Sequence, residues 1–379
     1  MRWPQVWQRR LARQFLSHPV PRTQLREVVR QMCGVHAQVQ PSAELSLAIR
    51  VAGLTRHDLD EALWRQRSLV RTYGPRGTVH IFAVDDLPLW LSALRARTPP
   101  RPPDKQELST LPSDRLPDLL HAMREALDGK CLSRAELAAE LEQRLGTWAT
   151  EEAFPAFGGF LPRWHLALST AANEGVLAFG PPRGNQVTYV RLDQWLPELP
   201  SVDGERALAE VFRRYLDSYG PATHMEFARW FVTHPAAAKA LQASLREELE
   251  EVDIEGTRAW QLASAEHGDG GTRAHLLPQF DSYIVGCHPR EQLIPGVAAE
   301  RLGRRDTAAM FNVLLVDGVV SGLWERKRSS KRLEVRVDAF SKLSTAQWHQ
   351  VVAQAERMAA FLAREADVSS GHVAPRGHL

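Results

Sequence analysis

Apolar residues recur at helical spacing on both sides of a short polar segment near the N-terminus. Upstream they are Leu25, Val28, Val29 and Met32, and downstream they are Leu45, Ala48, Ile49 and Ala52. Spacings of i, i+3, i+4 and i+7 predict amphipathic helices. The polar segment between them (residues 34–42) begins with Gly34, which is typical of a helix end, and closes on Pro41, which suits a helix start. Side chains two apart in an extended chain point the same way, so His36 and Gln38 are expected to face one space.

The elements around this segment follow the order of a winged helix. Helices are predicted over 7–15, 23–32 and 43–52, and Thr55 with Asp58 forms a capping box that opens a fourth. Two β-rich runs, 69–73 and 78–82, are joined by Gly74-Pro75-Arg76-Gly77, which predicts a hairpin.

The same order recurs in the next part of the chain. An apolar stripe over 116–127 predicts one helix, and a capping box of Ser133 and Glu136 opens another. A third helix is predicted over 163–174. Strands are then predicted over 176–179 and 186–190, joined by a wing with a basic tip.

A third copy begins near Asp203. It has a wide apolar stripe to residue 219, a helix capped by Thr223 and Glu226, and an alanine-rich helix over 235–249. A hairpin follows, with its strands at 252–254 and 258–261. Three matches at roughly 80-residue spacing indicate an internal repeat.

The pattern then changes to alternating, strand-like runs. These are residues 275–277, 283–286, 308–316, 319–325 and 333–337, with a hairpin signal at Asp317-Gly318. They predict a small antiparallel sheet or partial barrel. An amphipathic helix follows from Ser344, and the residues after Asp367 are expected to fray.

The predicted fold class is therefore mainly α with a small β component (α+β). It comprises three tandem winged-helix units, a small antiparallel sheet or partial barrel, and a C-terminal helix. The expected bounds are 1–97 for the first unit, 105–200 for the second, 201–265 for the third and 266–379 for the C-terminal β region. The proline-rich stretch 98–104 is the clearest linker.

Composition narrows the class of protein. The chain of 379 residues is 44% apolar and 24% charged, which is typical of a globular protein with two or three domains. Three scattered cysteines are too few for a disulfide framework and indicate a reducing compartment. No apolar run reaches the roughly 20 residues of a membrane helix, and no signal-peptide core follows Met1. We expect a cytoplasmic protein that makes no membrane contact.

A net charge of +2 means that binding to a polyanion must depend on local clusters. Winged helices most often bind DNA, and the candidate DNA-binding residues lie in the predicted wings and in the C-terminal hairpin: Arg71, Arg76, Arg183, Asn185, Trp324, Arg326, Lys327 and Arg328. The alternative is that these are solvated surface groups. The run from Glu325 to Arg332 is the densest, so it favours nucleic-acid contact, and its hairpin is preferred over the Arg183–Asn185 wing for the minor groove.

Motifs for other chemistries are missing. Cys33 and His36 lack a paired second half, and Cys287-His288 is a lone couple, so no metal site is predicted. There is no glycine-rich phosphate loop and no Gly-x-Ser-x-Gly elbow, and no cofactor is expected. Gln279 and Asp281 are polar groups inside an apolar run. Together with Gln40 they are candidates to line a cleft, although a strand-end turn with Asp281 hydrogen-bonded to the backbone is the favoured explanation of that segment.

Several segments together resemble the AlkZ-like bacterial DNA glycosylases. They are Val35-His36-Ala37-Gln38, residues 69–80 (LVRTYGPRGTVH), 219–223 (YGPAT), 276–281 (LLPQFD) and 318–324 (GVVSGLW). The resemblance covers most of the chain. It implies tandem winged-helix units, in agreement with the repeat, and excision of alkylated purines, including bulky N7-alkylguanine lesions made by genotoxic natural products. Some members of that family protect the producing organism, and some unhook interstrand crosslinks.

The resemblance also implies a catalytic motif of Gln or His, an aliphatic residue, and Gln. Two registers fit, His36-Ala37-Gln38 and Gln38-Val39-Gln40, and the distance to the following helix favours the first. The catalytic residues are then His36 and Gln38, a His-type variant that points to bulky monoadducts more than to crosslinks. A neutral His36 with a pKa of about 6.5 would accept a proton from water. The Gln38 carbonyl would orient that water or face the developing positive charge.

Two readings of the whole chain remain open. The first is a monofunctional DNA glycosylase for double-stranded DNA carrying alkylated purines, monomeric and associated with the nucleoid when bound. Its lesion base would be flipped out or attacked in place within a cleft. The second is a winged-helix regulator that binds duplex DNA without catalysis. A scaffold with neither activity is a third possibility, which the basic hairpin opposes.

Overall fold

The N-terminal region (residues 1–97) folds around a three-stranded sheet in the order β2-β5-β4. Its strands are β2 (Val35–His36), β4 (Leu69–Tyr73) and β5 (Val79–Ala83), and its helices are α1 (Trp3–Arg13), α2 (Leu25–Gln31), α3 (Gln40–Ala48), α4 (Arg56–Asp60) and α5 (Leu87–Ala96). The predicted hairpin and the Thr55 capping box are confirmed. Helix α3 ends earlier than predicted, because Val51 and Ala52 form β3 (Val51–Ala52) and pair in parallel with β1 (Val20–Pro21).

The computed structural model describes residues 1–100, 111–156, 159–196, 198–264, 273–303, 305–329 and 331–375. In the second region (residues 111–196) the predicted order of three helices and a hairpin is present: α6 (Leu116–Ala126), α7 (Arg134–Leu145), α8 (Leu168–Asn173), β9 (Leu177–Arg183) and β10 (Gln186–Arg191). Strand β6 (Cys131–Ser133) and helix α9 (Leu192–Trp195) were not predicted. An extra hairpin, β7 (Glu152–Ala156) with β8 (Gly159–Pro162), was not predicted. Its strands contain Pro155 and Pro162, and proline disfavours a strand prediction because it has no amide hydrogen to donate to a neighbouring strand.

The third region (residues 204–264) packs its first helix against α5. Its elements are α10 (Gly204–Tyr219), α11 (His224–Phe231), α12 (Pro235–Ser244), β11 (Leu249–Ile254) and β12 (Thr257–Leu262). The capping box of Thr223 and Glu226 is confirmed. The β11–β12 hairpin is longer at both ends than the predicted one and pairs in an unbroken antiparallel register.

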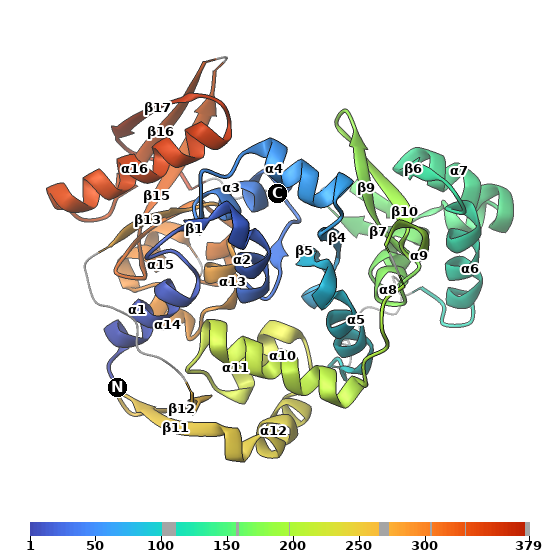
Figure 1. Ribbon diagram of the computed structural model, residues 1–379, viewed down its shortest axis with the longest axis horizontal. Coiled ribbons are helices and arrows are strands. Elements are labelled where there is room, and N and C mark those ends of the chain that lie inside the picture. The colour runs from blue at the N-terminus through green and yellow to red at the C-terminus, as the bar shows by residue number, and fades with distance from the viewer. Residues whose placement is uncertain are drawn as a thin grey trace.

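The C-terminal region (residues 273–375) is a five-stranded sheet in the order β13-β14-β15-β16-β17. Its strands are β13 (Ala274–Leu277), β14 (Val313–Val316), β15 (Val319–Arg328), β16 (Arg332–Ala339) and β17 (Glu365–Ser370), and its helices are α13 (Ser282–Gly286), α14 (Arg290–Leu293), α15 (Gly296–Leu302) and α16 (Thr345–Phe361). In Figure 1 the C-terminal strands and α16 lie at one end of the molecule, and α6 and α7 lie at the other.

Three predictions for this region are wrong. The run 308–316 is a strand only from Val313, because residues 305–310 form a 3-10 helix. The run 283–286 is helix α13 and not a strand, because the Asp281 side chain accepts from the Tyr283 amide and caps a helix there. Residues 368–370, which were expected to fray, are part of β17, which pairs in parallel with β16 and makes the sheet mixed; residues 376–379 lie outside the described residues. The hairpin at Asp317-Gly318 is confirmed, with both residues at positive φ, as a type I′ turn requires.

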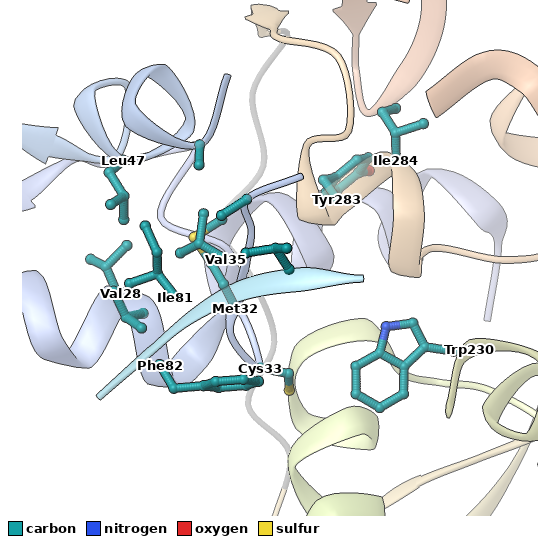
Figure 2. Packing of buried hydrophobic residues seen from close by; sticks show 14 of the residues in the cluster. Val28, Met32, Cys33, Val35, Leu47, Ile81, Phe82, Trp230, Tyr283 and Ile284 are labelled. Carbon is teal, nitrogen blue, oxygen red and sulfur yellow. The ribbon is translucent and has the colours of Figure 1, made fainter. Parts of the chain in front are cut away.

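One hydrophobic core joins the regions. Figure 2 shows side chains of α2, β2, α3 and β5 gathered together, with Trp230 of α11 and Tyr283 of α13 beside them: Val28, Met32, Val35, Leu47, Ile81 and Phe82. Gly34 sits where the chain leaves α2, at φ 85°, and a Cβ there would lie 2.4 Å from Phe82. The start of the polar segment is thus fixed directly against the core.

The mixed helix-and-sheet fold class is confirmed, whereas the tandem winged-helix arrangement and the four domain bounds stay predictions. Residues 101–104 of the predicted linker lie outside the described residues. Over the part of the chain that is described, no helix is both long and apolar enough to cross a membrane.

Candidate active site

Strand β2 delivers His36 to the edge of the three-stranded sheet. Its register places Val35 opposite Ile81 and His36 opposite His80 on β5. The Ala37 amide donates to the Val79 carbonyl at 2.7 Å, so the backbone beyond β2 still follows β5. The middle of the polar segment, residues 36–38, is therefore anchored along β5 before α3 begins at Gln40.

His36 is a buried imidazole in an aromatic surrounding. Its side chain is 6% exposed, its ring stacks on Phe280 at 5.1 Å between centroids, and the His80 ring meets it edge-on at 5.3 Å. Its Nδ1 is buried, and no described residue forms a hydrogen bond with it. Burial, followed by the nearby His80 and Arg76, lowers the pKa of His36 well below 6.5. The expected pKa near 6.5 is therefore corrected: the ring is neutral at neutral pH and is a weak base.

Gln38 is the exposed member of the pair. Its Oε1 accepts from the Val79 amide at 3.2 Å, which holds the oxygen beside β5 and leaves its second lone pair for another donor. The rest of the carboxamide lies in an exposed side chain. His36 and Gln38 thus both lie against β5, one beneath the surface and one at it.

Gln40 is occupied by protein contacts. Its Oε1 accepts from Arg71 Nη1 at 2.7 Å, and its Nε2 donates to Glu44 at 3.1 Å. As the first residue of α3 it is held by its own helix and by β4. A carboxamide held at both ends in this way is less available to a substrate than the carboxamide of Gln38.

Asp281 lies in the core and does not line a cleft. Its carboxylate accepts from Arg50 Nη1 and Nη2, each at 2.7 Å, and from the Ser46 hydroxyl at 2.7 Å. Both members of the ion pair are 0% exposed. Asp281 therefore fastens α3 to α13. Gln279 is half-buried, and its backbone amide donates to the Asn312 side-chain oxygen at 2.9 Å.

Two predicted DNA contacts are buried. Trp324 is 2% exposed, and its indole donates to the Leu277 carbonyl at 2.9 Å, so its ring has no access to a groove. Arg71 is 8% exposed and points at the polar segment. Successive side chains of β15 point to opposite faces of the sheet. Trp324 therefore lies on the core face, and Lys327, three residues later, lies on the exposed face.

The other basic candidates differ in availability. Arg76, at the β4–β5 turn, is half-buried and donates to the Trp230 carbonyl at 3.3 Å. Arg183 is exposed but donates to both Glu136 oxygens at 2.9 Å. Asn185 is exposed in the β9–β10 turn.

On β15, Lys327 is exposed and Arg326 half-buried, and the Arg328 side chain lies outside the described residues. The exposed face around Lys327 also carries Glu325, Glu334 and Asp367, so its positive charge is partly balanced.

His80 and Phe280 were not among the predicted site residues. His80 lies on β5 directly opposite His36 on β2. Side chains that face each other across two paired strands share their surroundings, so this pairing brings His80 to His36. Phe280 belongs to the segment 276–281 that carries the family resemblance. It has a positive φ of 59°, and its ring stacks on His36. Among the described residues no three His, Cys, Asp or Glu side chains are grouped to hold a metal ion.

Comparisons with known proteins agree on one family. The family model "DNA glycosylase AlkZ-like" matches residues 29–361. A Streptomyces sahachiroi protein described as an interstrand DNA cross-link repair glycosylase is 30% identical over 338 residues, covering 85% of this chain and 87% of the relative.

The solved structure of the Streptomyces sahachiroi DNA glycosylase AlkZ superposes with a TM-score of 0.80 at 28% identity, over 97% of this chain and 99% of that one. The polar segment and the residues packed around it lie within the matched range. The chain belongs to the AlkZ-like DNA glycosylase family.

Proposed function

We propose that this DNA glycosylase hydrolyses the N-glycosidic bond of N7-alkylated guanine in double-stranded DNA, with His36 and Gln38 acting on water and on the sugar. The observation that carries the proposal is the polar segment, where a neutral buried imidazole and an exposed carboxamide are both fixed against β5. The mechanism is hydrolytic and uses no cofactor.

Neutral groups suit this leaving group. An N7-alkylated guanine is already cationic, so it departs without a general acid. The remaining task is to hold water and to stabilise an oxocarbenium-like sugar, which is achieved by positioning and by fixed dipoles. A neutral His36 adds no repulsion to the developing positive charge. Gln38 cannot take a proton. Its Oε1 already accepts from the Val79 amide, and the second lone pair of that oxygen can orient the water or face the developing charge.

The preferred substrates are proposed to be bulky monoadducts, of the kind made by genotoxic natural products. The Streptomyces sahachiroi relative is described as an interstrand DNA cross-link repair glycosylase. The family motif has Gln or His at its first position, and His36 makes this chain the His-type variant. Base-excision repair and self-resistance to such a toxin are the corresponding roles. We propose that the enzyme acts as a cytoplasmic monomer, associated with the nucleoid when bound.

The β15–β16 hairpin is proposed to contact phosphates through Lys327 and Arg326, and the β9–β10 turn through Asn185. Replacing Lys327 with Gln removes one charge from an exposed strand position. If Lys327 neutralises one phosphate, the log–log salt slope of DNA binding becomes about 0.9 less steep. Fluorescence anisotropy between low and physiological salt measures this slope. An unchanged slope and affinity would exclude Lys327 from the interface.

The activity itself is tested on duplexes carrying a single N7-alkylguanine. Wild-type enzyme is expected to release the base and leave an abasic site, which hot alkali converts into a strand break visible on a denaturing gel. Unmodified duplex is the control. The competing reading, a winged-helix regulator, predicts a sequence-specific footprint with no break on either duplex. Duplexes with a small methyl adduct and with a bulky aromatic adduct compare the two lesion classes.

A further inference from the structure

We infer that Arg71 is a positioning residue that fixes the polar segment and is itself held by Phe179 of the second region. The inference rests on the proposed role of His36 and Gln38. It replaces the expectation that Arg71 touches DNA, and it identifies a further residue on which base release depends.

Arg71 donates one hydrogen bond to the peptide group between the two proposed catalytic residues and one to the Gln40 side chain. Its Nη1 donates to Gln40 Oε1 at 2.7 Å, and its Nη2 donates to the Ala37 carbonyl at 3.4 Å. The Ala37 amide is held on the other side by the Val79 carbonyl at 2.7 Å. Ala37 therefore has both its amide and its carbonyl tied, one to β5 and one to Arg71. Because Ala37 stands between His36 and Gln38, these bonds set the directions in which those side chains leave the backbone.

A guanidinium is suited to this position and an ammonium is not. Arg71 must reach two diverging oxygens and present a flat face to a ring, and its Cζ lies 4.5 Å from the centroid of Phe179. The planar fork of arginine does all of this with one side chain, whereas lysine offers a single point charge. The side chain is 8% exposed, and burial lowers the pKa of its guanidinium. A group placed to meet a phosphate would be expected at the surface.

Phe179 of β9 packs against two tyrosines, Tyr73 of β4 and Tyr189 of β10. Its ring lies 5.6 Å from Tyr73 and 5.3 Å from Tyr189. Phe179 of β9 therefore packs against the guanidinium of Arg71. Through this contact the position of the second region affects the polar segment. The ring can be altered without touching the segment, which makes Phe179→Leu a separate test of the support.

The chain supplies a matched control in Arg67. Its Cζ lies 3.9 Å from the Trp195 ring centroid, and its Nη1 donates to the Trp195 carbonyl at 2.9 Å. It is therefore a second arginine that joins the N-terminal region to an aromatic side chain of the second region, and no hydrogen bond links it to the polar segment. Arg67→Ala removes a comparable contact between the regions and a comparable charge.

The experiment compares Arg71→Ala, Arg71→Lys, Phe179→Leu and Arg67→Ala by single-turnover base release and by DNA affinity. Arg71→Ala is expected to slow release on the order of 100-fold, as misplacement of a reacting group does, with affinity and salt slope unchanged. Arg71→Lys keeps the charge and is expected to lose rate as well. Arg67→Ala is expected to keep the wild-type rate, and Phe179→Leu to fall in between.

A structural readout separates this inference from the proposed function. Amide hydrogen exchange over residues 35–42 is expected to speed up in Arg71→Ala and to stay at the wild-type rate in Arg67→Ala. If wild-type enzyme released no base, the proposed function would fail, and exchange would still decide whether Arg71 holds the segment. If Arg71→Ala does not fold, Arg71→Lys and Phe179→Leu carry the same measurements.

Normal release with weakened, less salt-dependent binding in Arg71→Ala would make Arg71 a DNA contact and overturn the inference. Unchanged exchange over 35–42 in the folded variants would overturn it too.

Discussion

Gln38→Ala is expected to slow base release from N7-alkylguanine DNA on the order of 100- to 1000-fold, the loss that follows removal of one preorganised dipole from a transition state. His36→Ala is expected to lose a comparable factor. Gln38 is the exposed carboxamide of the polar segment, with its oxygen anchored on the Val79 amide. His36 lies beneath it between Phe280 and His80.

Single-turnover rates on a duplex with one lesion provide the measurement, with DNA affinity as the control. Affinity should stay close to wild type, since neither side chain carries a charge that neutralises phosphate. His36→Ala also decides the register. Full activity in that variant would select Gln38-Val39-Gln40 and remove His36 from the mechanism. Full activity in both variants would remove the polar segment from the chemistry.

The same rate should be flat between about pH 8 and pH 6, because His36 is already neutral there. Its pKa is held well below 6.5 by burial first, then by His80 and Arg76. A histidine with an ordinary pKa of about 6.5 acting as a base would instead lose up to tenfold in rate for each pH unit below that value. If the base-release rate of the wild-type enzyme declined in this way while its DNA affinity did not, His36 would be assigned the role of proton acceptor.

Asp281→Ala is expected to lower the free energy of unfolding by about 3–5 kcal/mol, the cost of leaving a buried charge without its partner. Arg50 and Asp281 are both 0% exposed, and two hydrogen bonds of 2.7 Å join them. The substitution also removes the acceptor for Ser46 and the cap of α13. Helix α3 begins at Gln40, so this pair also supports the end of the polar segment.

Urea denaturation measures the loss, and an exposed ion pair is the control. Arg332 and Asp367 lie 3.9 Å apart and are 60% and 56% exposed. Asp367→Ala should therefore change stability by about 0–1 kcal/mol. Replacing both Arg50 and Asp281 with apolar residues of similar volume should recover part of the Asp281→Ala loss, since no charge is then left unpaired. An Asp281→Ala loss as small as that of Asp367→Ala would contradict the buried-pair account.

The sequence alone determined the features that depend on neighbours along the chain. The capping boxes at Thr55, Ser133 and Thr223 lie where they were predicted, because each uses side chains three residues apart. The turn at Asp317-Gly318 is likewise local. The quoted segments were sufficient to indicate the family to which the comparisons assign the chain.

The tertiary structure decided the features that depend on distant partners. The run 283–286 reads as a strand until Arg50, more than two hundred residues earlier, fixes Asp281 as a helix cap. Residues 365–370 form a strand only because β16 offers its edge. Arg71 reads as a surface wing residue until Phe179 covers it and Gln40 accepts its hydrogen bond.

His36 follows the same rule. Its spacing from Gln38 is written in the sequence, but its burial comes from Phe280 and His80, and the lowered pKa of its ring comes from that burial. Local hydrogen bonds and periodicity are encoded within a few residues. Desolvation, ion pairing and strand edges arise only when remote segments meet, so the positions of the polar groups could be predicted and their environments could not.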